Sequence, residues 1–359
     1  MKYITYVGSY TTKEHEYGMH ICESDNETGA IRVLRKIAVP NTTYMALSKD
    51  GKRLYSVISS DKFGPPGFDG GLAYFKTDGD DVKLVSEIST TKTTPCHISL
   101  SPDEKSVVFA EYSLATAGYV DLKEDGSFQS DSMKIIQHIG DGPNKPRQNA
   151  AHAHCSIVSP DGKYLLVTDL GIDCVKAYDF KNREKGIEES IETTIKTLPS
   201  GAGPRHTVFH PNGRFMFVIF ELLNLVSSYV YDGTSFYLLD TKKLIPGNFD
   251  SFSKAAAIKI SEDGSQLFCS NRGHDSITVF NVNQKGGLEY LNNTRLNGKF
   301  PRDFEFMPGG NFCLIGLKES WEVGSYAYDK KTGVFTPVQK IEGIYRPLFF
   351  KFNTAQNAS

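Results

Sequence analysis

Residues 154–167 read HCSIVSPDGKYLLV, an apolar segment followed by an Asp-Gly turn and a second apolar segment. β-Branched, aromatic and aliphatic residues on both sides of such a turn are typical of a β-hairpin. The same pattern occurs five more times, and these copies begin at Met45, His97, His206, Ala257 and Asp303. Repeats spaced roughly fifty residues apart and built only from strand signals predict a β-propeller, with one repeat per blade.

A second motif follows the first at the same period and supplies the outer half of each blade. It consists of a strand, a Gly-containing turn and the start of another strand, and its copies begin at Gly18, Gly71, Gly118, Cys174, Val226, Ser276 and Val323. This motif occurs seven times against six copies of the first, and the missing copy is divided between the chain ends. Residues 347–352 (PLFFKF) have the inner-strand pattern, and residues 3–9 (YITYVGS) have the pattern of the strand that follows it.

The two motifs together predict an all-β fold, a seven-bladed β-propeller with four antiparallel strands per blade. The ring is expected to close by pairing the N- and C-terminal strands in one blade, which removes the open sheet edges that promote aggregation. We expect residues 1–359 to form a single domain, because closed all-β folds of this size are common as one domain.

The composition excludes several function classes. A net charge of −2 gives no basic surface for nucleic acid or for an anionic membrane. The chain has no apolar stretch long enough to span a bilayer and no leader-like start, so we expect a cytoplasmic protein. The six cysteines include no C-x-x-C pair and are expected to be mostly buried thiols. A monomer or a weak homo-oligomer is expected.

The long or irregular connections of the predicted blades all lie on one face, where binding and catalysis concentrate. On that face, the residues nearest the central channel begin the first strand of a blade or end the second. The starts are His97, His152, His154, Arg205, His206, Arg302, Asp303 and Arg346, and the ends are Glu111, Asp169, Glu221, Asn271, Arg272 and Glu319. These rim positions predict a functional site. The alternative is a polar, water-filled channel without chemistry.

The rim residues favour an anionic substrate. Arg205, Arg272 and Arg302 opposite Glu221 could bind an anion through bidentate guanidinium contacts. A histidine beside a carboxylate and arginines provides a general base next to groups that stabilise an oxyanion. We expect Glu221 to neutralise only one of Arg205 and Arg272, so that a bound anion would lie between the two arginines.

No metal and no cofactor are expected. His152 and His154 are two residues apart and could form a metal-binding pair, but no carboxylate triad accompanies them and the arginines would repel a divalent cation. The sequence contains no P-loop, no G-x-G-x-x-G, no G-x-S-x-G and no H-E-x-x-H motif. A nucleotide cofactor and a serine nucleophile are therefore not expected.

Several segments resemble the seven-bladed lactonase family, which includes propeller-type 6-phosphogluconolactonases and fungal carboxymuconate lactonising enzymes. The resemblance runs nearly end to end, and its most specific segments are GAGPRH from Gly201 and SNRGHDSI from Ser270, supported by AHAHCSIVSPDGKYLLV from Ala151, FPRDFEF from Phe300 and the opening YVGSYT. Carried over by position, the family's catalytic residues fall on His154, Arg205, Glu221 and Arg272. The other rim residues expected to bind substrate are His152, His206, Asn271, Arg302 and Asp169.

The resemblance implies hydrolysis of a small anionic sugar-acid lactone such as 6-phosphogluconolactone, without metal or nucleotide. In this hypothesis Arg205 and Arg272 polarise the carbonyl and bind the anionic group, and His154 activates water. Glu221 orients the histidine or an arginine.

Two alternatives stay open. A cycloisomerase of the muconate-lactonising kind would use the same rim to transfer a proton next to a carboxylate. A non-catalytic propeller that binds sugars or proteins would have an apolar patch or exposed aromatic side chains on one face. The candidates for these are Phe63, Phe68 and Trp321.

Overall fold

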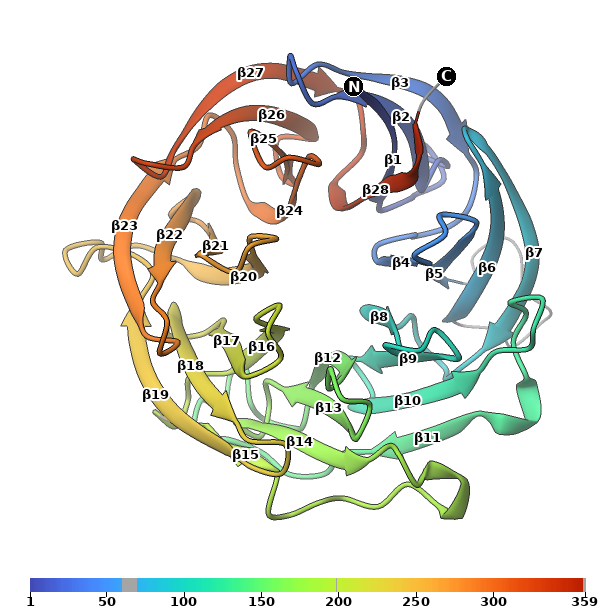
Figure 1. Cartoon of the computed structure of the whole chain (residues 1–359), viewed down its shortest axis with the longest axis vertical. Coiled ribbons are helices and arrows are strands. Elements are labelled where there is room, and N and C mark those ends of the chain that lie inside the picture. The colour runs from blue at the N-terminus through green and yellow to red at the C-terminus, as the bar shows by residue number, and fades with distance from the viewer. Residues whose placement is uncertain (60–69, 198, 358–359) are drawn as a thin grey trace. The chain divides into compact units, whose positions relative to one another are not determined.

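The computed structural model of the chain describes residues 1–59, 70–197 and 199–357. Phe63 and Phe68 lie outside the described residues. Within them the predicted strand signals form 28 β-strands, which pair into seven four-stranded antiparallel sheets (Figure 1). Two 3₁₀ turns, η1 (Ser130–Ser132) and η2 (Arg183–Lys185), complete the regular structure of this part of the chain. None of its helices is long and apolar enough to span a membrane.

The described chain divides into two compact units. The first unit comprises Met1–Ile98, Asp121–Asp131 and Leu296–Ser359. Its three sheets, in strand order, are β28 (Pro347–Asn357), β1 (Lys2–Ser9), β2 (Met19–Asp25) and β3 (Ile31–Ile37); β4 (Met45–Leu47), β5 (Arg53–Ser59), β6 (Gly70–Asp78) and β7 (Asp81–Ser89); and β24 (Pro301–Phe306), β25 (Phe312–Leu317), β26 (Glu322–Asp329) and β27 (Val334–Glu342).

The second unit comprises Ser99–Val120 and Ser132–Arg295. Its sheets are β11 (Lys134–Gln137), β10 (Thr116–Asp121), β9 (Ser106–Glu111) and β8 (His97–Leu100); β12 (Ala153–Val158), β13 (Tyr164–Asp169), β14 (Cys174–Asp179) and β15 (Ile195–Lys196); β16 (Pro204–Phe209), β17 (Phe215–Phe220), β18 (Leu225–Tyr231) and β19 (Phe236–Lys243); and β20 (Lys254–Ile260), β21 (Gln266–Arg272), β22 (Ser276–Val282) and β23 (Leu288–Arg295). In sequence order, each predicted repeat supplies one such sheet. The prediction of a single domain over residues 1–359 stays a prediction.

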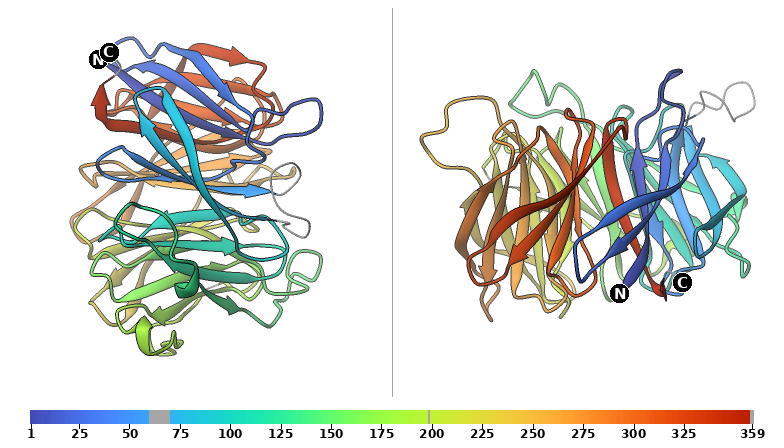
Figure 2. Two further views of the ribbon diagram at one scale, coloured as in Figure 1. Left: turned by 90° about the vertical axis from the view of Figure 1, so that its right-hand side faces the viewer. Right: turned by 90° about the horizontal axis from the view of Figure 1, so that it is seen from above.

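The two chain ends share one sheet, as the repeat count predicted. Strand β1 pairs with β2 on one side and with β28 on the other, where Val7 lies opposite Phe350 (Figures 1 and 2). Leu348, Phe349 and Phe352 of β28 are also buried. Because β28 supplies both backbone pairing and apolar side chains, it completes the sheet that the N-terminal strands begin.

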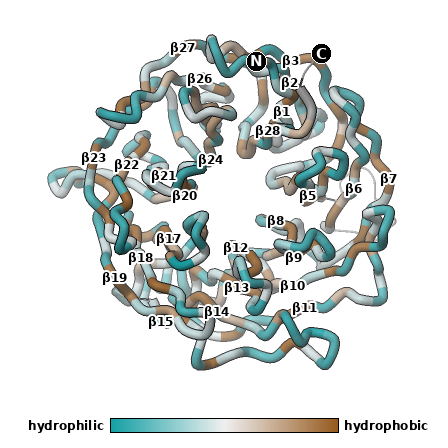
Figure 3. The backbone as a smooth tube through the Cα atoms, in the orientation of Figure 1, coloured by the Kyte–Doolittle hydropathy of each residue, from teal (hydrophilic) through white to brown (hydrophobic). Residues whose placement is uncertain are grey.

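The core of each unit lies between neighbouring sheets. In the second unit, Phe217 and Ile219 of β17 pack with Leu267 and Cys269 of β21, and in the first unit Tyr6 packs with residues of β5 and β6. The hydrophobic segments follow the strands, whereas hairpin turns are hydrophilic (Figure 3). This pattern is the one that alternating strand sequences between polar turns produce. Five of the six cysteines are buried free thiols, as expected.

Candidate active site

A β-bulge places several of the predicted rim side chains. The pairing of β12 with β13 shifts between Ala153 and Cys155, so His154 is the extra residue of the bulge. Similar shifts fall at Arg205 in β16 and at Arg302 in β24. A bulge disturbs the simple alternation of side chains and aims the extra residue in a new direction. The strand pattern identified these residues but could not show how the bulge turns them.

Glu221, directly after β17, is the centre of a cluster of arginines in the second unit. Its Oε2 accepts a hydrogen bond from Arg205 Nε at 3.1 Å and forms an ion pair with Arg272 Nη2 at 2.8 Å, and its Oε1 accepts a hydrogen bond from Arg147 Nη2 at 2.8 Å. The side chains of Glu221, Arg205 and Arg272 are almost completely buried, whereas that of Arg147 is 27% exposed. Three guanidinium groups thus surround one carboxylate.

The arginines keep Glu221 ionised. Burial by itself would raise the pKa of this carboxyl, but the positive charges of Arg272 and Arg205, with that of Arg147, hold the pKa well below its usual value of 4.5. Glu221 pairs with both Arg205 and Arg272, so the expectation that one of these arginines would need a bound anion as its partner is wrong. A carboxylate has two oxygens with about four acceptor positions, so it can bind several donors at once. The argument for an anion held between these two arginines fails with it.

Two histidines complete the cluster. The rings of His154 and His206 lie 5.1 Å apart at an angle of 69°. His206 Nε2 lies 3.1 Å from Arg205 Nη1, which also donates to the Ala256 carbonyl at 2.7 Å. The structure therefore brings His154, Arg205, Glu221 and Arg272 together, with His206 as a direct neighbour.

Arg147 is the member of this cluster that strand-based reasoning missed. It lies in the loop between β11 and β12, where its backbone N–H donates to the Asn144 carbonyl at 2.8 Å. The next residue, Gln148, is fully buried and donates to the Leu170 carbonyl at 2.8 Å and to Asp173 at 2.7 Å. These bonds hold the loop so that Arg147 reaches Glu221. The only sequence signal was a basic residue in a long loop on the predicted functional face.

The backbone of Glu221 is held from two sides. Its N–H donates to the Gly203 carbonyl at 2.8 Å, and its own carbonyl accepts from the Ala255 N–H at 3.2 Å. Gly203 has φ +65° and a Cβ at this position would lie 2.7 Å from the Leu222 side chain. Only glycine meets both conditions without strain, so the GAGP segment serves to place Glu221 and Arg205.

Asp169 has different surroundings from those expected of a substrate-binding residue. Its Oδ2 lies 2.7 Å from His138 Nδ1, and its Oδ1 accepts from the N–H groups of His152 at 2.7 Å and Gly171 at 2.8 Å. His138 Nε2 in turn lies 3.0 Å from the Tyr178 hydroxyl, and the side chains of Asp169, His138 and Tyr178 are buried. These contacts fit a structural role, in which Asp169 holds the backbone that leads into β12. They lend no support to the prediction that Asp169 binds substrate.

His152 and Asn271 lie beside the cluster. The His152 ring stacks on Tyr112 at 4.2 Å, and Tyr112 also meets the His154 ring edge to face at 5.6 Å. Asn271 is fully buried and its Nδ2 donates to Ser276 at 3.1 Å and Thr278 at 2.9 Å, so it fixes the β21–β22 hairpin. His152 is partly exposed and remains available to a ligand, whereas Asn271 supports the fold.

Arg302 and Trp321 lie in the first unit and are described within it. Arg302 is partly exposed at the bulge of β24. Trp321 is 42% exposed and its ring meets Tyr345 edge to face at 4.9 Å, while His15 stacks on the same tyrosine at 4.3 Å. Trp321 is thus the one predicted exposed aromatic that the described residues contain.

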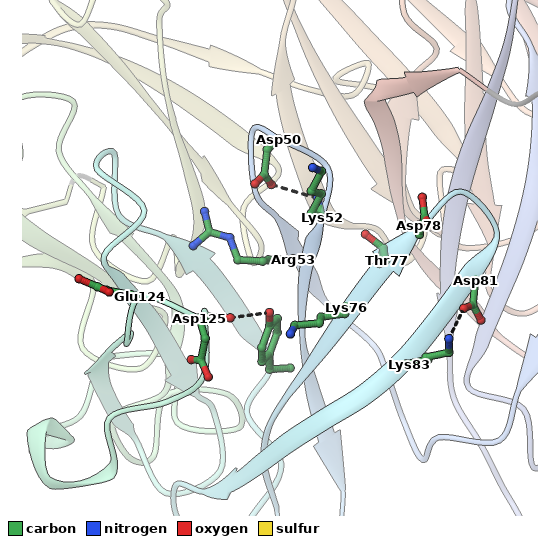
Figure 4. Close-up of a pocket in the computed structure, with 11 residues that line it drawn as sticks. Asp50, Lys52, Arg53, Lys76, Thr77, Asp78, Asp81, Lys83, Glu124 and Asp125 are labelled. Atoms are coloured by element: carbon green, nitrogen blue, oxygen red, sulfur yellow. Dashed lines mark hydrogen bonds and ion pairs between the residues drawn. The ribbon is translucent and has the colours of Figure 1, made fainter.

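A separate hollow of about 730 Å³ lies at the turn ends of the first unit (Figure 4). Its charges are mixed, and Lys83 pairs with Asp81 at 2.7 Å. The hollow is lined by Asp50, Lys52, Arg53, Tyr74, Lys76, Thr77, Asp78, Asp81, Lys83, Glu124 and Asp125. It contains no histidine and none of the predicted site residues, so it offers no comparable chemistry. Over residues 1–59, 70–197 and 199–357, no group of three or more His, Cys, Asp or Glu side chains could hold a metal ion.

The chain belongs to the family described as "Lactonase, 7-bladed beta-propeller", and the match to this family covers residues 4–352. The seven sheets are therefore the blades of this propeller, as the sequence predicted. Among named relatives, the 6-phosphogluconolactonase of Bacillus subtilis (strain 168) is 33% identical over 357 residues, which cover 98% of both chains. The 6-phosphogluconolactonase of Formosa agariphila is 31% identical over 91% of this chain and 93% of its own.

Solved structures agree with this assignment. The periplasmic gluconolactonase of Pseudomonas aeruginosa has a TM-score of 0.89 at 28% identity, covering 98% of this chain and 99% of its own. A putative 6-phosphogluconolactonase from Bacteroides fragilis has a TM-score of 0.87 at 28% identity, covering 98% of both chains. The protein is thus a member of the propeller lactonases, and lactone hydrolysis is the activity class that its relatives' names support.

Proposed function

We propose that this protein hydrolyses 6-phosphogluconolactone, with His154 as general base. The observation that carries the proposal is the buried cluster, in which a histidine lies among guanidinium groups fixed by an ionised carboxylate. The names of the relatives from Bacillus subtilis and Formosa agariphila support the choice of substrate.

The proposed reaction is water attack on the lactone carbonyl. His154 takes a proton from water as the water oxygen bonds to the carbonyl carbon. The positive charges of Arg205 and Arg272 stabilise the negative charge that develops on the carbonyl oxygen. The ring C–O bond then breaks, and His154 returns the proton to the departing ring oxygen, which leaves a hydroxy acid. Glu221 acts through the arginines, because its carboxylate sets their orientation before the substrate arrives.

A lactone-opening assay tests the proposal. With 6-phosphogluconolactone as substrate, His154→Ala should lower kcat by about 10²- to 10⁴-fold, the usual effect of removing a general base. His210→Ala is the matched control, because His210 directly follows β16 at the strand end opposite Arg205 and His206. This control should retain the wild-type rate, and a chelator should leave the rate unchanged.

Two results would contradict the proposal. Unchanged turnover in His154→Ala would eliminate the proposed base. Absence of ring opening by the wild-type protein on both phosphorylated and free aldonolactones, together with conversion of an unsaturated dienoate followed by its absorbance, would assign the site to a cycloisomerase.

A further inference from the structure

Positive charge around Glu221 exceeds what one carboxylate can neutralise. Lys254, the first residue of β20, lies opposite Arg272 in the pairing with β21, and paired residues project from the same side of a sheet. Burial lowers the pKa of Lys254, and the nearby charges of Arg147 and Arg272 lower it further against the opposing effect of Glu221. Arg147, Arg205, Arg272 and Lys254 therefore share the single negative charge of Glu221.

The Nη1 atom of Arg147 indicates that a ligand binds beside it. Its Nη2 donates to Glu221 at 2.8 Å and to the Tyr112 hydroxyl at 3.3 Å. Its Nη1 is buried, yet this atom meets no hydrogen-bond acceptor among the residues that the structure describes. Leaving a buried charged donor without an acceptor is costly, so an oxygen from a bound molecule is the partner that this geometry favours.

The four cations divide into an inner and an outer pair. The side chains of Arg205 and Arg272 are 2% and 6% exposed and both bind Glu221 Oε2. Arg147 is 27% exposed, and Lys254 is also partly exposed. A ligand entering from solvent therefore meets the outer pair, Arg147 and Lys254, before it reaches the inner one.

We propose that Arg147 and Lys254 form the binding subsite for a phosphate monoester carried by the substrate, beside the lactone-opening centre. This inference rests on the proposed function, because it names what distinguishes the phosphorylated lactone from the free one. A phosphate dianion offers several acceptor oxygens, which suit the planar guanidinium donors of Arg147 and the point charge of Lys254. The Tyr112 hydroxyl accepts a hydrogen bond from Arg147 Nη2 and so helps to orient this guanidinium group.

Calorimetric binding of the reaction product tests the subsite without turnover. The probes are 6-phosphogluconate and gluconate, titrated into the wild-type protein and into Arg147→Met, Arg147→Lys and Lys254→Met. We expect the wild-type protein to bind 6-phosphogluconate more tightly than gluconate. Each Met variant should weaken binding of 6-phosphogluconate by roughly 10- to 100-fold, the usual effect of one charge-assisted hydrogen bond. Arg147→Lys should recover part of that loss.

Arg214→Met is the control, because Arg214 is exposed in the turn between β16 and β17, at the end of these strands opposite Arg205, and should leave the affinity within about twofold of wild type. Equal wild-type affinity for both probes would overturn the subsite, as would unchanged phosphate preference in Lys254→Met. A loss confined to Arg147→Met and accompanied by a lower melting temperature would assign Arg147 to the support of Glu221 instead. Because the readout is binding, absence of lactonase activity would refute the proposed function alone and leave this result interpretable.

Discussion

Glu221 in the second unit and Glu319 in the first both come from rim positions at the end of a second strand, and both pair with arginines. The Glu221 contacts to Arg205 and Arg272 measure 3.1 and 2.8 Å between side chains that are at most 6% exposed. The Glu319 contact to Arg346 measures 3.6 Å, and the two side chains are 37% and 39% exposed. The same sequence signal has therefore produced a buried cluster in one place and a surface ion pair in the other.

The difference shows that burial gives such a pair its chemical value. In water the attraction between two charges is weak and each is well solvated, so a surface pair contributes little and constrains little. Away from water each charge depends on its protein partners, so their geometry is held firmly and can stabilise a reacting group. Of the two sites compared, the Glu221 cluster meets this condition.

Replacing each of the two carboxylates in turn should give the largest difference in stability between the two sites. Glu221→Gln leaves buried guanidinium groups without compensation, and we expect a loss of about 3–5 kcal/mol in the free energy of unfolding. Glu319→Gln should cost less than about 1 kcal/mol. Urea unfolding of both variants measures the difference, and equal losses would show that burial does not separate the two sites.

Replacing the arginines by lysine should have a smaller effect. Arg205 donates through Nε to Glu221 and through Nη1 to the Ala256 carbonyl, and one ammonium group cannot span both acceptors. Arg205→Lys should therefore lower the free energy of unfolding by about 1–3 kcal/mol. Arg346→Lys keeps a surface charge and should cost less than about 0.5 kcal/mol. Thermal melting of the two variants compares them, and a larger loss in Arg346→Lys would contradict this ranking.

The smallest expected effect is that of moderate acid. The folded-state pKa of Glu221 lies well below its ordinary value of 4.5, so its stabilisation is present above 4.5 and is lost only as the pH falls through the lower, folded-state value. The difference in unfolding free energy between wild type and Glu221→Gln should accordingly stay constant from pH 7 to about pH 5. Urea unfolding at several pH values measures this difference. A decline that begins above pH 5 would mean that the carboxylate is not held ionised as the contacts indicate.

The sequence by itself determined the blades and their closure. Alternating apolar residues and turn residues are local signals, and their seven-fold recurrence decided the number of sheets and the pairing of residues 3–9 with residues 347–352. The same regularity identified His154, Arg205, Glu221 and Arg272 as positions at corresponding strand ends. The resemblance of the surrounding segments to lactonases pointed to the same four residues.

Only the tertiary structure decided which of the polar rim residues act together. Asp169 and Asn271 occupy rim positions equivalent to that of Glu221, yet their side chains are used by His138 and by the β21–β22 hairpin. Arg147 belongs to no repeat, and it reaches Glu221 because Gln148 holds its loop against residues more than twenty positions away. A repeat pattern specifies strand and face, because these follow from neighbours in sequence. Depth of burial, bulge direction and the partners of a loop depend on contacts between distant segments, which no local pattern contains.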